Sequence, residues 1–439
     1  MDAFTAAAAH ALGGPDSLRA RRAEAFEAVE TVPLPTEKEE VWRYTPIDRL
    51  DLGSYRPVGH EGPAAIGDLG LAFVGELGTD VAARAGLAVA ANGTMVSAGT
   101  QGLPLGLRVR SVLQTADAAE GLGSVLVGGD ALVRLNDAFA PDVVAVDVAP
   151  GVELAAPLLL VHWCEGQADA AGRGPAVFPR TVVRVGAGAR ASVVEVVAGA
   201  PGPTASLVVP VTELEVADGG SLAYVSVQLL GAAAWHIGRI AGRVGREGTL
   251  RAFTMGLGAS YDRMRTDVAA VGQGASTELR SAYLGSGDQV HDVRTQQEHA
   301  APRTTSDLLC KGAVADASRS VYSGLIQVRH GAVRADAMQT NHALVLSEGA
   351  HADSVPNLDI AENDVRCSHA STVGPIDEDQ RSYLESRGIP PERADRLIVL
   401  GFYDDVIDRL PVPELAPRLR RQVGERLASV FSASGGSDG

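Results

Sequence analysis

The chain has 439 residues, a formal net charge of −16, and 46% hydrophobic but only 4% aromatic side chains. Its length exceeds one compact core of ordinary size, so two or three structural units are expected. The acidic balance argues against nucleic-acid binding through a basic surface, since phosphate contacts need clustered Lys and Arg. With 50 glycines and few aromatics, the composition favours layered β-structure built from small and branched aliphatic side chains.

The N-terminal part, residues 1–95, is expected to form a helical and mixed domain with a loop-rich connector. A helix is predicted over residues 16–30, with Asp16 or Ser17 as its N-cap. Prolines then interrupt the chain around Trp42, which predicts the connector. The chain starts without a basic segment followed by a long apolar one, and it contains no run of about 18 apolar residues, so a cytoplasmic protein is expected.

Residues 96–374 consist of short runs of Val, Leu, Ile and Thr separated by small residues, which is typical of strands. A glycine precedes many of these runs, with successive spacings of 37, 32, 28, 26, 38, 19 and 18 residues. The spacings of 18 and 19, and 37 as a double step, are interpreted as one coil of a β-solenoid. The middle values do not fit that coil, and a β-sandwich is the alternative. The glycines are Gly151, Gly188, Gly220, Gly248, Gly274, Gly312, Gly331 and Gly349.

Residues 375–432 are predicted to form a C-terminal helical domain. Asp377 lies three residues before Gln380, which is a capping-box spacing, and Gly388 is placed to end that helix. A second helix begins at the Pro-Pro pair after Gly388, and a third begins near Glu414. The polar, glycine-rich tail 433–439 is expected to be disordered.

Cys367 and His369 stand two residues apart in the stretch NDVRCSHASTVG. If this stretch is a strand, both side chains point to one face while Ser368 points to the other. Two ligands on one face form half of a metal site, because zinc and iron–sulfur sites normally need four ligands or an open position. The missing ligands would then come from a distant segment or a second polypeptide. The alternative is a small buried thiol beside a hydrogen-bonded strand histidine.

The lysines exclude nucleotide hydrolysis through a P-loop in this chain. Such a loop needs Gly-Lys followed by Ser or Thr, whereas Lys38 lies in EKEE and Lys311 in CKGA. The other cysteines, Cys164 and Cys310, are interpreted as structural, because apart from Lys311 nothing near either indicates an activated thiolate.

From about residue 300 onward the chain resembles the SufB/SufD family, the β-helical components of the SUF iron–sulfur cluster assembly machine. SufB members typically read LEHEAT where this chain reads CSHAST, and SufD members read CSHGAT. The sequence is therefore similar to the SufD branch, with Ala370 and Ser371 in place of Gly-Ala. LPTEKEEVWRYTPI upstream also resembles that branch. The carrying stretches are DLLCKGAVADASRSVYSGLIQV, RADAMQTNHALVLSEGAHADSVPNLDIAENDVRCSHASTVG and DEDQRSYLESRGIPPERADRLIVLGF.

The resemblance implies a mainly β fold, a right-handed parallel β-helix flanked by N-terminal and C-terminal helical domains. It also implies a heterodimer with a SufB-type paralogue and docking of a SufC-type ABC ATPase on the C-terminal helices. His369, with Cys367 beside it, would lie at the SufB interface and face a transient iron–sulfur cluster shared with SufB. Cys367 would either ligate iron or line the interface.

Four residues of the matching C-terminal motif are expected to shape the ATPase dock, with helix packing as their alternative role: Tyr383, Arg387, Gly388 and Phe402. The expected function is a non-catalytic scaffold subunit that holds no cofactor tightly by itself, and flavin binding by the complex is left open. Two other functions compete. One is a SufB-like homodimeric scaffold, and the other is a β-helix carbohydrate-active enzyme with a groove of acidic and basic side chains.

Overall fold

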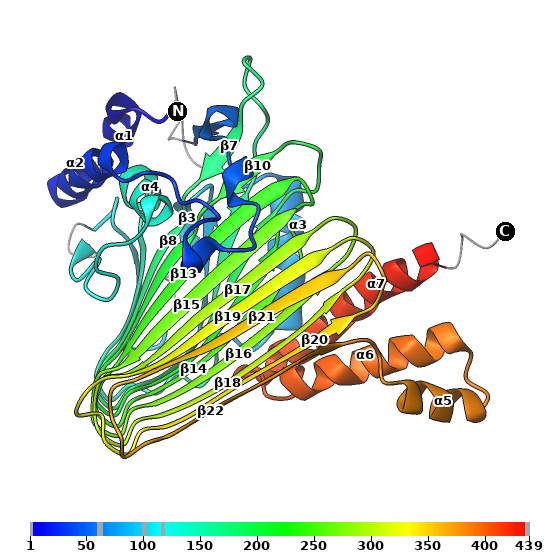
Figure 1. The fold of residues 1–439 in the computed structure, drawn as a ribbon. Helices are drawn as coiled ribbons and strands as arrows, with labels where there is room; N and C mark the ends of the chain where they lie inside the picture. Colours follow the sequence, from blue (N-terminus) through cyan, green and yellow to red (C-terminus); the bar gives the residue numbers. More distant parts are fainter. Residues whose placement is uncertain (1–2, 59–64, 99–102, 116–118, 435–439) are drawn as a thin grey trace.

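Two large sheets face each other along the length of the molecule, with helices at both ends (Figure 1). The computed structural model describes residues 3–58, 65–98, 103–115 and 119–434. Successive strands join the two sheets alternately through most of the chain, so that one strand from each sheet makes one turn of a β-solenoid of about seven turns. The predicted solenoid is thereby confirmed. The strands of successive coils pair in parallel, unlike those of the sandwich alternative.

Sheet A contains twelve strands among the described residues. Its spatial order is β21 (His351–Ile360), β19 (Arg319–Val328), β17 (Val290–His299), β15 (Tyr261–Ala270), β13 (Ala234–Val244), β11 (Val211–Val216), β8 (Arg180–Val185), β5 (Val144–Val148) and β4 (Leu107–Ser111). Three short strands pair beside this path, β1 (Tyr55–Pro57), β7 (Gly174–Val177) and β10 (Ser206–Val208).

Sheet B contains ten strands in the same part of the chain. Its order is β22 (Arg366–Gly374), β20 (Asp336–Val345), β18 (Thr305–Val314), β16 (Ser276–Gly285), β14 (Thr249–Gly256), β12 (Ser221–Leu229), β9 (Arg190–Gly199), β6 (Leu158–Cys164), β2 (Gly86–Ala91) and β3 (Thr94–Ala98). The antiparallel pair of β2 and β3 lies across the expected domain boundary at residue 95. That boundary and those at 374 and 432 stay predictions.

The helices lie outside the two sheets. They are α1 (Ala6–Ala11), α2 (Asp16–Thr31), α3 (Asp68–Asp80), α4 (Ala131–Phe139), α5 (Glu378–Ser386), α6 (Pro391–Ile407) and α7 (Ala416–Ser434). Short 3-10 turns occupy Glu40–Trp42, Ile47–Arg49, Leu52–Ser54 and Pro413–Leu415. In the described chain no helix is both long and apolar enough to cross a membrane. Residues 435–439 of the expected disordered tail lie outside the described residues.

The coil is longer than the sequence analysis expected. Tyr261 pairs with Val290, and Val290 pairs with Arg319, so neighbouring coils are 29 residues apart. The expected coil of 18 or 19 residues is therefore wrong. Gly331 precedes β20 and Gly349 precedes β21, so their spacing is only half a coil. The glycine spacings of 28 and 26, which seemed not to fit, are close to whole coils, because each coil holds two strands and two turns.

Inward-facing side chains of equivalent strands form columns through the core. One column contains Val185, Val216, Val244 and Ala270, all buried. Gly312, which the sequence analysis placed before a strand, lies inside β18 instead. It makes room for the buried ring of Tyr283, because a Cβ at residue 312 would stand 1.9 Å from that ring. Close approach explains this glycine better than a turn does.

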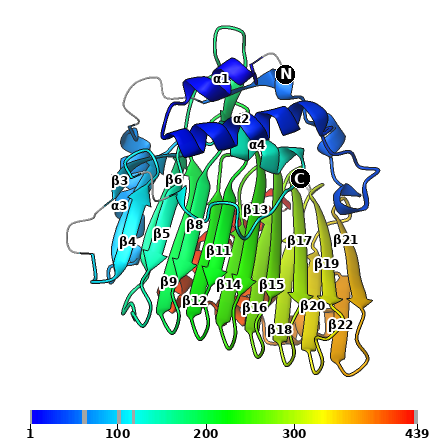
Figure 2. The same ribbon diagram turned by 90° about the vertical axis from the view of Figure 1, so that its left-hand side faces the viewer.

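The N-terminal helices cover one end of the outer face of sheet A (Figure 2). The ring of Phe4 packs edge-on against that of Phe139 in α4, 5.3 Å between centroids, and both contact Phe178. The predicted helix is confirmed as α2, but the predicted cap is wrong. Pro15 is the N-cap, with φ −66° and ψ 157°, and no side chain caps the helix.

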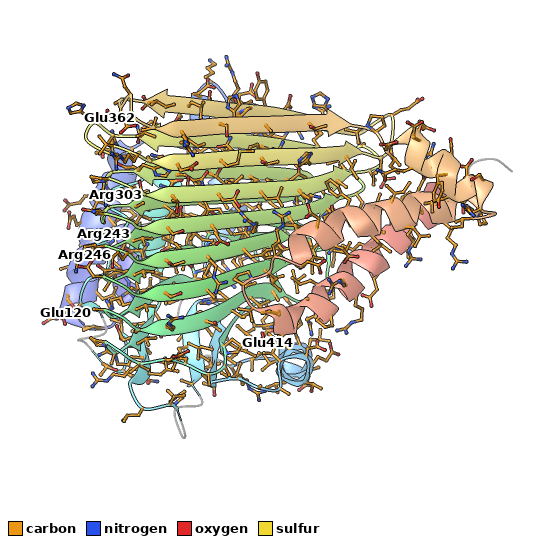
Figure 3. The ribbon with its side chains drawn as sticks, turned by 90° about the horizontal axis from the view of Figure 1, so that it is seen from below. Glu120, Arg243, Arg246, Arg303, Glu362 and Glu414 are labelled. Atoms are coloured by element: carbon orange, nitrogen blue, oxygen red, sulfur yellow. The ribbon has the colours of Figure 1, made fainter. Side chains whose placement is uncertain are left out.

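The C-terminal helices lie across the outer face of sheet B (Figure 3). Val399 and Tyr403 of α6 belong to the same buried cluster as Phe253 and Leu309 of the sheet. The predicted cap of α5 is confirmed, because the Asp377 side chain accepts hydrogen bonds from the backbone N–H groups of the first turn. The predicted helix end is confirmed too, since Gly388 follows the C-cap with φ +81°.

Candidate functional site

The Cys–His pair lies on β22, the strand at the edge of sheet B. In the described chain β22 pairs with β20 on one side and with no strand on the other. Strand β21 occupies the equivalent edge of sheet A. These two strands are the last coil of the solenoid, and we call the surface that they present the open end.

His369 continues an inward-facing column of the core. It pairs with Gln339, which pairs with Leu308, which in turn pairs with Leu279. Those three side chains are buried, whereas His369 is exposed. The difference follows from position, since no described coil covers the last one. The imidazole therefore sits at the mouth of the solenoid interior, and a coil added beyond β22 would cover it.

Cys367 points the same way as His369, as the predicted spacing requires. It pairs with the buried Ala337 and packs beside Ile326 and Val328 at the rim of the core. Burial raises the pKa of the Cys367 thiol, and the carboxylate of Asp336 raises it further. A neutral thiol is therefore favoured in the isolated chain, and a bound metal or a partner's positive charge would be needed to favour the thiolate.

Polar side chains extend from the open end into the core, and the sequence analysis did not single them out. The Asn341 amide donates to the Ser354 hydroxyl at 2.9 Å, and Ser354 is 2.6 Å from the Ser371 hydroxyl, which links three strands of the last two coils. The buried amide of Gln339 makes no protein hydrogen bond. The sequence does carry a signal for these polar core residues, because Gln and Asn stand two residues apart in MQTNHA and therefore share one face of a strand. The sequence alone does not say whether that face points into the solenoid or toward solvent.

The pair does not form a complete metal site in this chain. Within the described ranges, no group of three or more His, Cys, Asp and Glu side chains could hold a metal ion. Cys367 and His369 are thus brought to one face, at the open end, but they belong to no group of three or more such side chains among the described residues. Additional ligands would have to come from another polypeptide or from the cargo itself.

Three of the four predicted docking residues gather at the end of α5. The Tyr383 side chain is 59% exposed, and the Arg387 guanidinium lies 5.4 Å from the centroid of its ring. Gly388 follows directly and is exposed. These residues form a small protruding surface beside α6. Their role in docking stays a prediction.

Phe402, the fourth, lies in a different place. It is half-buried on α6, where the Lys311 ammonium sits 4.5 Å from its ring centroid. The same ammonium donates to the Phe402 carbonyl at 3.1 Å and pairs with Asp405 at 2.7 Å. This geometry fastens α6 to β18, so Phe402 takes part in packing the helix on the sheet, and its role in docking stays a prediction.

A groove of about 600 Å³ lies between α6 and α7. Leu397, Leu400 and Phe431 supply apolar surface, while Arg393 and Arg396 supply charge. Leu397 is largely exposed although it belongs to an apolar helix face. The sequence analysis did not identify this groove.

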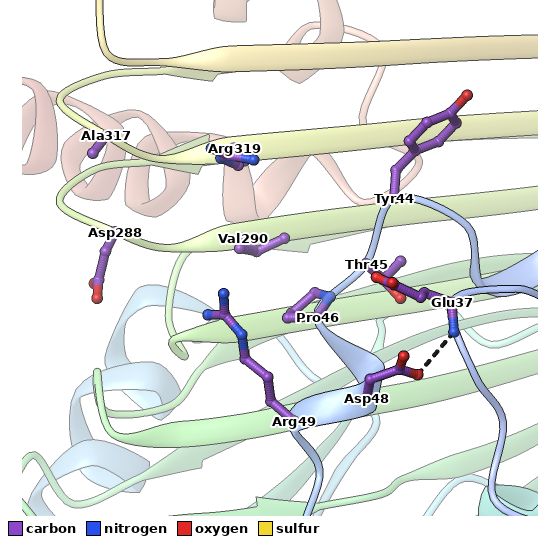
Figure 4. A pocket seen from close by; sticks show the side chains of 10 residues that line it. All are labelled: Glu37, Tyr44, Thr45, Pro46, Asp48, Arg49, Asp288, Val290, Ala317 and Arg319. Atoms are coloured by element: carbon purple, nitrogen blue, oxygen red, sulfur yellow. Dashed lines mark hydrogen bonds between the residues drawn. The ribbon is translucent and has the colours of Figure 1, made fainter.

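A pocket of about 460 Å³ lies where the connector meets sheet A (Figure 4). Arg49 and Arg319 line it together with Glu37, Asp48 and Asp288, so its charges are mixed. The backbone N–H of Glu37 donates to Asp48 at 3.0 Å. This balance of charges indicates no single class of ligand.

Comparisons with known proteins agree with the geometry. The family profile described as "SUF system FeS cluster assembly, SufBD core domain" matches residues 167–402. The chain belongs to this family. An iron–sulfur cluster assembly SufBD family protein of Mycobacterium tuberculosis is 37% identical over 200 residues, which cover 44% of this chain and 50% of that protein.

Two further relatives indicate the branch. The iron–sulfur cluster assembly protein SufD of Escherichia coli is 26% identical over 394 residues, 90% of this chain and 89% of that protein. SufD of Bacillus subtilis is 31% identical over 211 residues, 48% of each chain. Within the family the chain therefore falls in the SufD branch, as its CSH motif predicted. The matched part spans about half the length of the mycobacterial and Bacillus relatives.

Proposed function

We propose that this chain is a non-catalytic scaffold subunit in iron–sulfur cluster assembly. Its open end pairs with a SufB-type paralogue, and its C-terminal helices receive a SufC-type ATPase. The nascent cluster is cargo held between the two solenoids, with His369 and Cys367 contributing from this side. The open end is the observation that carries the proposal.

The last coil leaves core side chains uncovered. Leu358 pairs with the buried Ile326, and Ile360 pairs with the buried Val328, yet they are 39% and 41% exposed. Val373 on β22 is 41% exposed in the same way. Solenoids normally cover the last coil with a polar cap, and free strand edges invite pairing with another chain. A coil from a similar solenoid would pair with the free strand edges and cover the exposed core side chains.

The Cys–His pair supports a shared site for the cargo. Cys and His are ligands for iron–sulfur clusters, and both side chains point toward the open end from adjacent inward positions. A coil docked there would bring its own ligands to the same face. The proposal therefore explains why a pair that is incomplete within one chain lies at its uncovered end.

The groove between α6 and α7 supports the ATPase dock. Its apolar floor and arginine rim resemble a protein-docking surface more than a small-molecule site. The contact of Lys311 with Phe402 and Asp405 joins α6 to sheet B. ATP-driven movement of the helices would thus be transmitted to the solenoid and to the shared interface.

The test compares wild type with His369→Ala after co-expression with the SufB-type and SufC-type partners. We expect the complex to assemble normally while bound iron and cluster absorbance fall, because losing one ligand weakens metal binding by about tenfold or more. His330→Ala is the matched control, since His330 is exposed on the turn before β20. It should retain the cluster.

Cluster content equal to wild type in His369→Ala would overturn the ligand role and leave the pair structural. Failure of the wild-type chain to join the partners would overturn the scaffold role itself. A stable homodimer that assembles a cluster without partners would favour the SufB-like alternative.

A further inference from the structure

A second hollow lies on the outer face of sheet A, on the other side of the connector from the pocket of Figure 4. Its volume is about 270 Å³. Arg263 and Arg265 of β15 and Arg294 of β17 line it, together with Ser323 and Leu325 of β19. We call it the arginine cavity.

One side of the arginine cavity holds a carboxylate shared by two arginines. Asp267 accepts from Arg239 at 2.6 Å and from Arg265 at 2.9 Å. All three side chains are half-buried. Burial lowers the pKa of Arg239, and Asp267 only partly opposes this while Arg265 adds to it. One carboxylate therefore does not balance the two guanidinium groups.

On the other side of the cavity, a second aspartate is likewise shared by two arginines, and these three side chains are more deeply buried. Asp292 pairs with Arg263 and, at 2.5 Å, with Arg294. All three are buried. The two arginines also hold the connector, because Arg263 donates to the carbonyl of Val41 and Arg294 to the carbonyl of Arg43. These contacts fix the position of the guanidinium groups.

The charges around the cavity are unequal. Three lining arginines, and Arg239 outside the lining, share Asp267 and the buried Asp292. Even counting the more distant Asp130, which caps α4, one positive charge remains in excess. Glu40 at the rim is paired with Arg43 and does not alter this balance. Such an excess is unexpected in a protein with a net charge of −16. Uncompensated charge at half-buried positions is costly unless an anion or water offsets it.

We propose that the arginine cavity binds a small molecule through an oxyanion, a phosphate or a carboxylate group. Planar guanidinium groups match such oxyanions by paired hydrogen bonds, and the Ser323 hydroxyl offers a further donor. Val41 and Leu325 provide apolar surface for the body of the ligand. The volume suits a small metabolite rather than a polymer. The cavity reaches Asn357 on the last coil, but the proposal does not depend on the proposed assembly role.

Calorimetric titration of the full chain with inorganic phosphate and, separately, with citrate tests the site and distinguishes phosphate from carboxylate. We expect saturable binding of at least one probe, weakened about tenfold or more in Arg265→Gln, because a hydrogen bond to a charged group is lost. Arg319→Gln is the control, since Arg319 is an exposed arginine on the same sheet face outside this cavity. It should bind like wild type.

Asp267→Asn should change the affinity for the anion in the opposite direction. It removes one negative charge from the array, so anion binding should tighten severalfold, whereas a purely structural carboxylate would give unchanged or weaker binding. The proposal is overturned if neither probe binds saturably to wild type, if Arg265→Gln binds as tightly as wild type, or if Asp267→Asn fails to tighten binding. Because the two variants change affinity in opposite directions, loss of folding in one leaves the other decisive.

Discussion

His299 occupies a core column that is otherwise made of aliphatic and alanine side chains. It pairs with Ala270 on one side and Val328 on the other, and it is buried. Its Nδ1 lies 2.7 Å from the Thr304 hydroxyl and its Nε2 2.8 Å from the Ser306 hydroxyl. Burial lowers the pKa of His299 to about 4, although the Asp336 carboxylate opposes the shift. The folded protein therefore holds a neutral imidazole.

This pKa predicts that the protein begins to lose stability near pH 6.5, above the range where carboxylates titrate. Below about pH 6.5 the unfolded chain takes up a proton at His299, whereas the folded chain does so only near pH 4. The free energy of unfolding should fall as pH drops through that window, by up to about 3 kcal/mol. Urea unfolding at pH 7, 6, 5 and 4 measures it. His299→Gln should show a flatter dependence, and an equal slope in both proteins would contradict the prediction.

At the residue scale, the sequence shows which side chains share a face of a strand, but it does not show what surrounds them in the fold. The shared face of Cys367 and His369 follows from strand geometry alone, and the structure bears it out. That His299 is a core residue could not be predicted from the sequence, because the face of the strand on which it lies is not evident there. Placing it requires the pairing of each strand with the next coil, which depends on the coil length.

Elements were predictable where their signals are local. The capping aspartate and the terminal glycine of α5 each act within a few residues, so sequence reading located them. The length of a coil, in contrast, has no local signal in the sequence. The glycines mark turns at both sheets, so whole-coil and half-coil spacings mix, and Gly312 adds a packing glycine to the series. The arginine cavity was equally hidden, since its arginines come from two strands in successive coils.

Lys311 is the contact that decides how α6 sits on sheet B. Lys311 is buried, and its ammonium pairs with Asp405 and donates to the Phe402 carbonyl. Lys311→Met keeps the bulk but removes the ammonium from the Phe402 carbonyl and leaves Asp405 paired with Arg409 alone, so the free energy of unfolding should fall by about 1–3 kcal/mol. Amide exchange in α6 should accelerate more than exchange in α2.

Asp405→Asn and the double variant complete a thermodynamic cycle for this contact. A coupling energy close to zero would contradict the view that Lys311 and Asp405 fasten the helix to the sheet. A clear coupling energy would support it. The same variants test whether movement of α6 reaches the open end, through cluster content in the assembled complex.

At the scale of the whole molecule, the solenoid is asymmetric. Helices cover sheet A at the N-terminal end and sheet B along α6 and α7, whereas the last coil is uncovered (Figures 1 and 3). The core columns become more polar toward that end, through Gln339 and Asn341 to His369. A core that ends on exposed Leu and Ile beside a His and a Cys is suited to continue into another protein.

The open end can be tested independently of any cluster. Leu358→Asp with Ile360→Asp places charges where a partner coil would bury these side chains. Both side chains are already about 40% exposed, so the isolated chain should remain folded. We expect binding to the SufB-type partner to weaken by at least tenfold, measured by calorimetry, since a buried unpaired charge costs several kcal/mol.

Leu69→Asp is the matched control, because Leu69 is an exposed apolar residue on α3, 60% exposed and distant in sequence from the last coil. It should leave partner binding unchanged. If the open-end variant binds the partner as tightly as wild type does, the heterodimer is formed elsewhere. The exposed columns of the last coil would then need another occupant, such as a second copy of this chain, which size measurement of the wild type alone would detect.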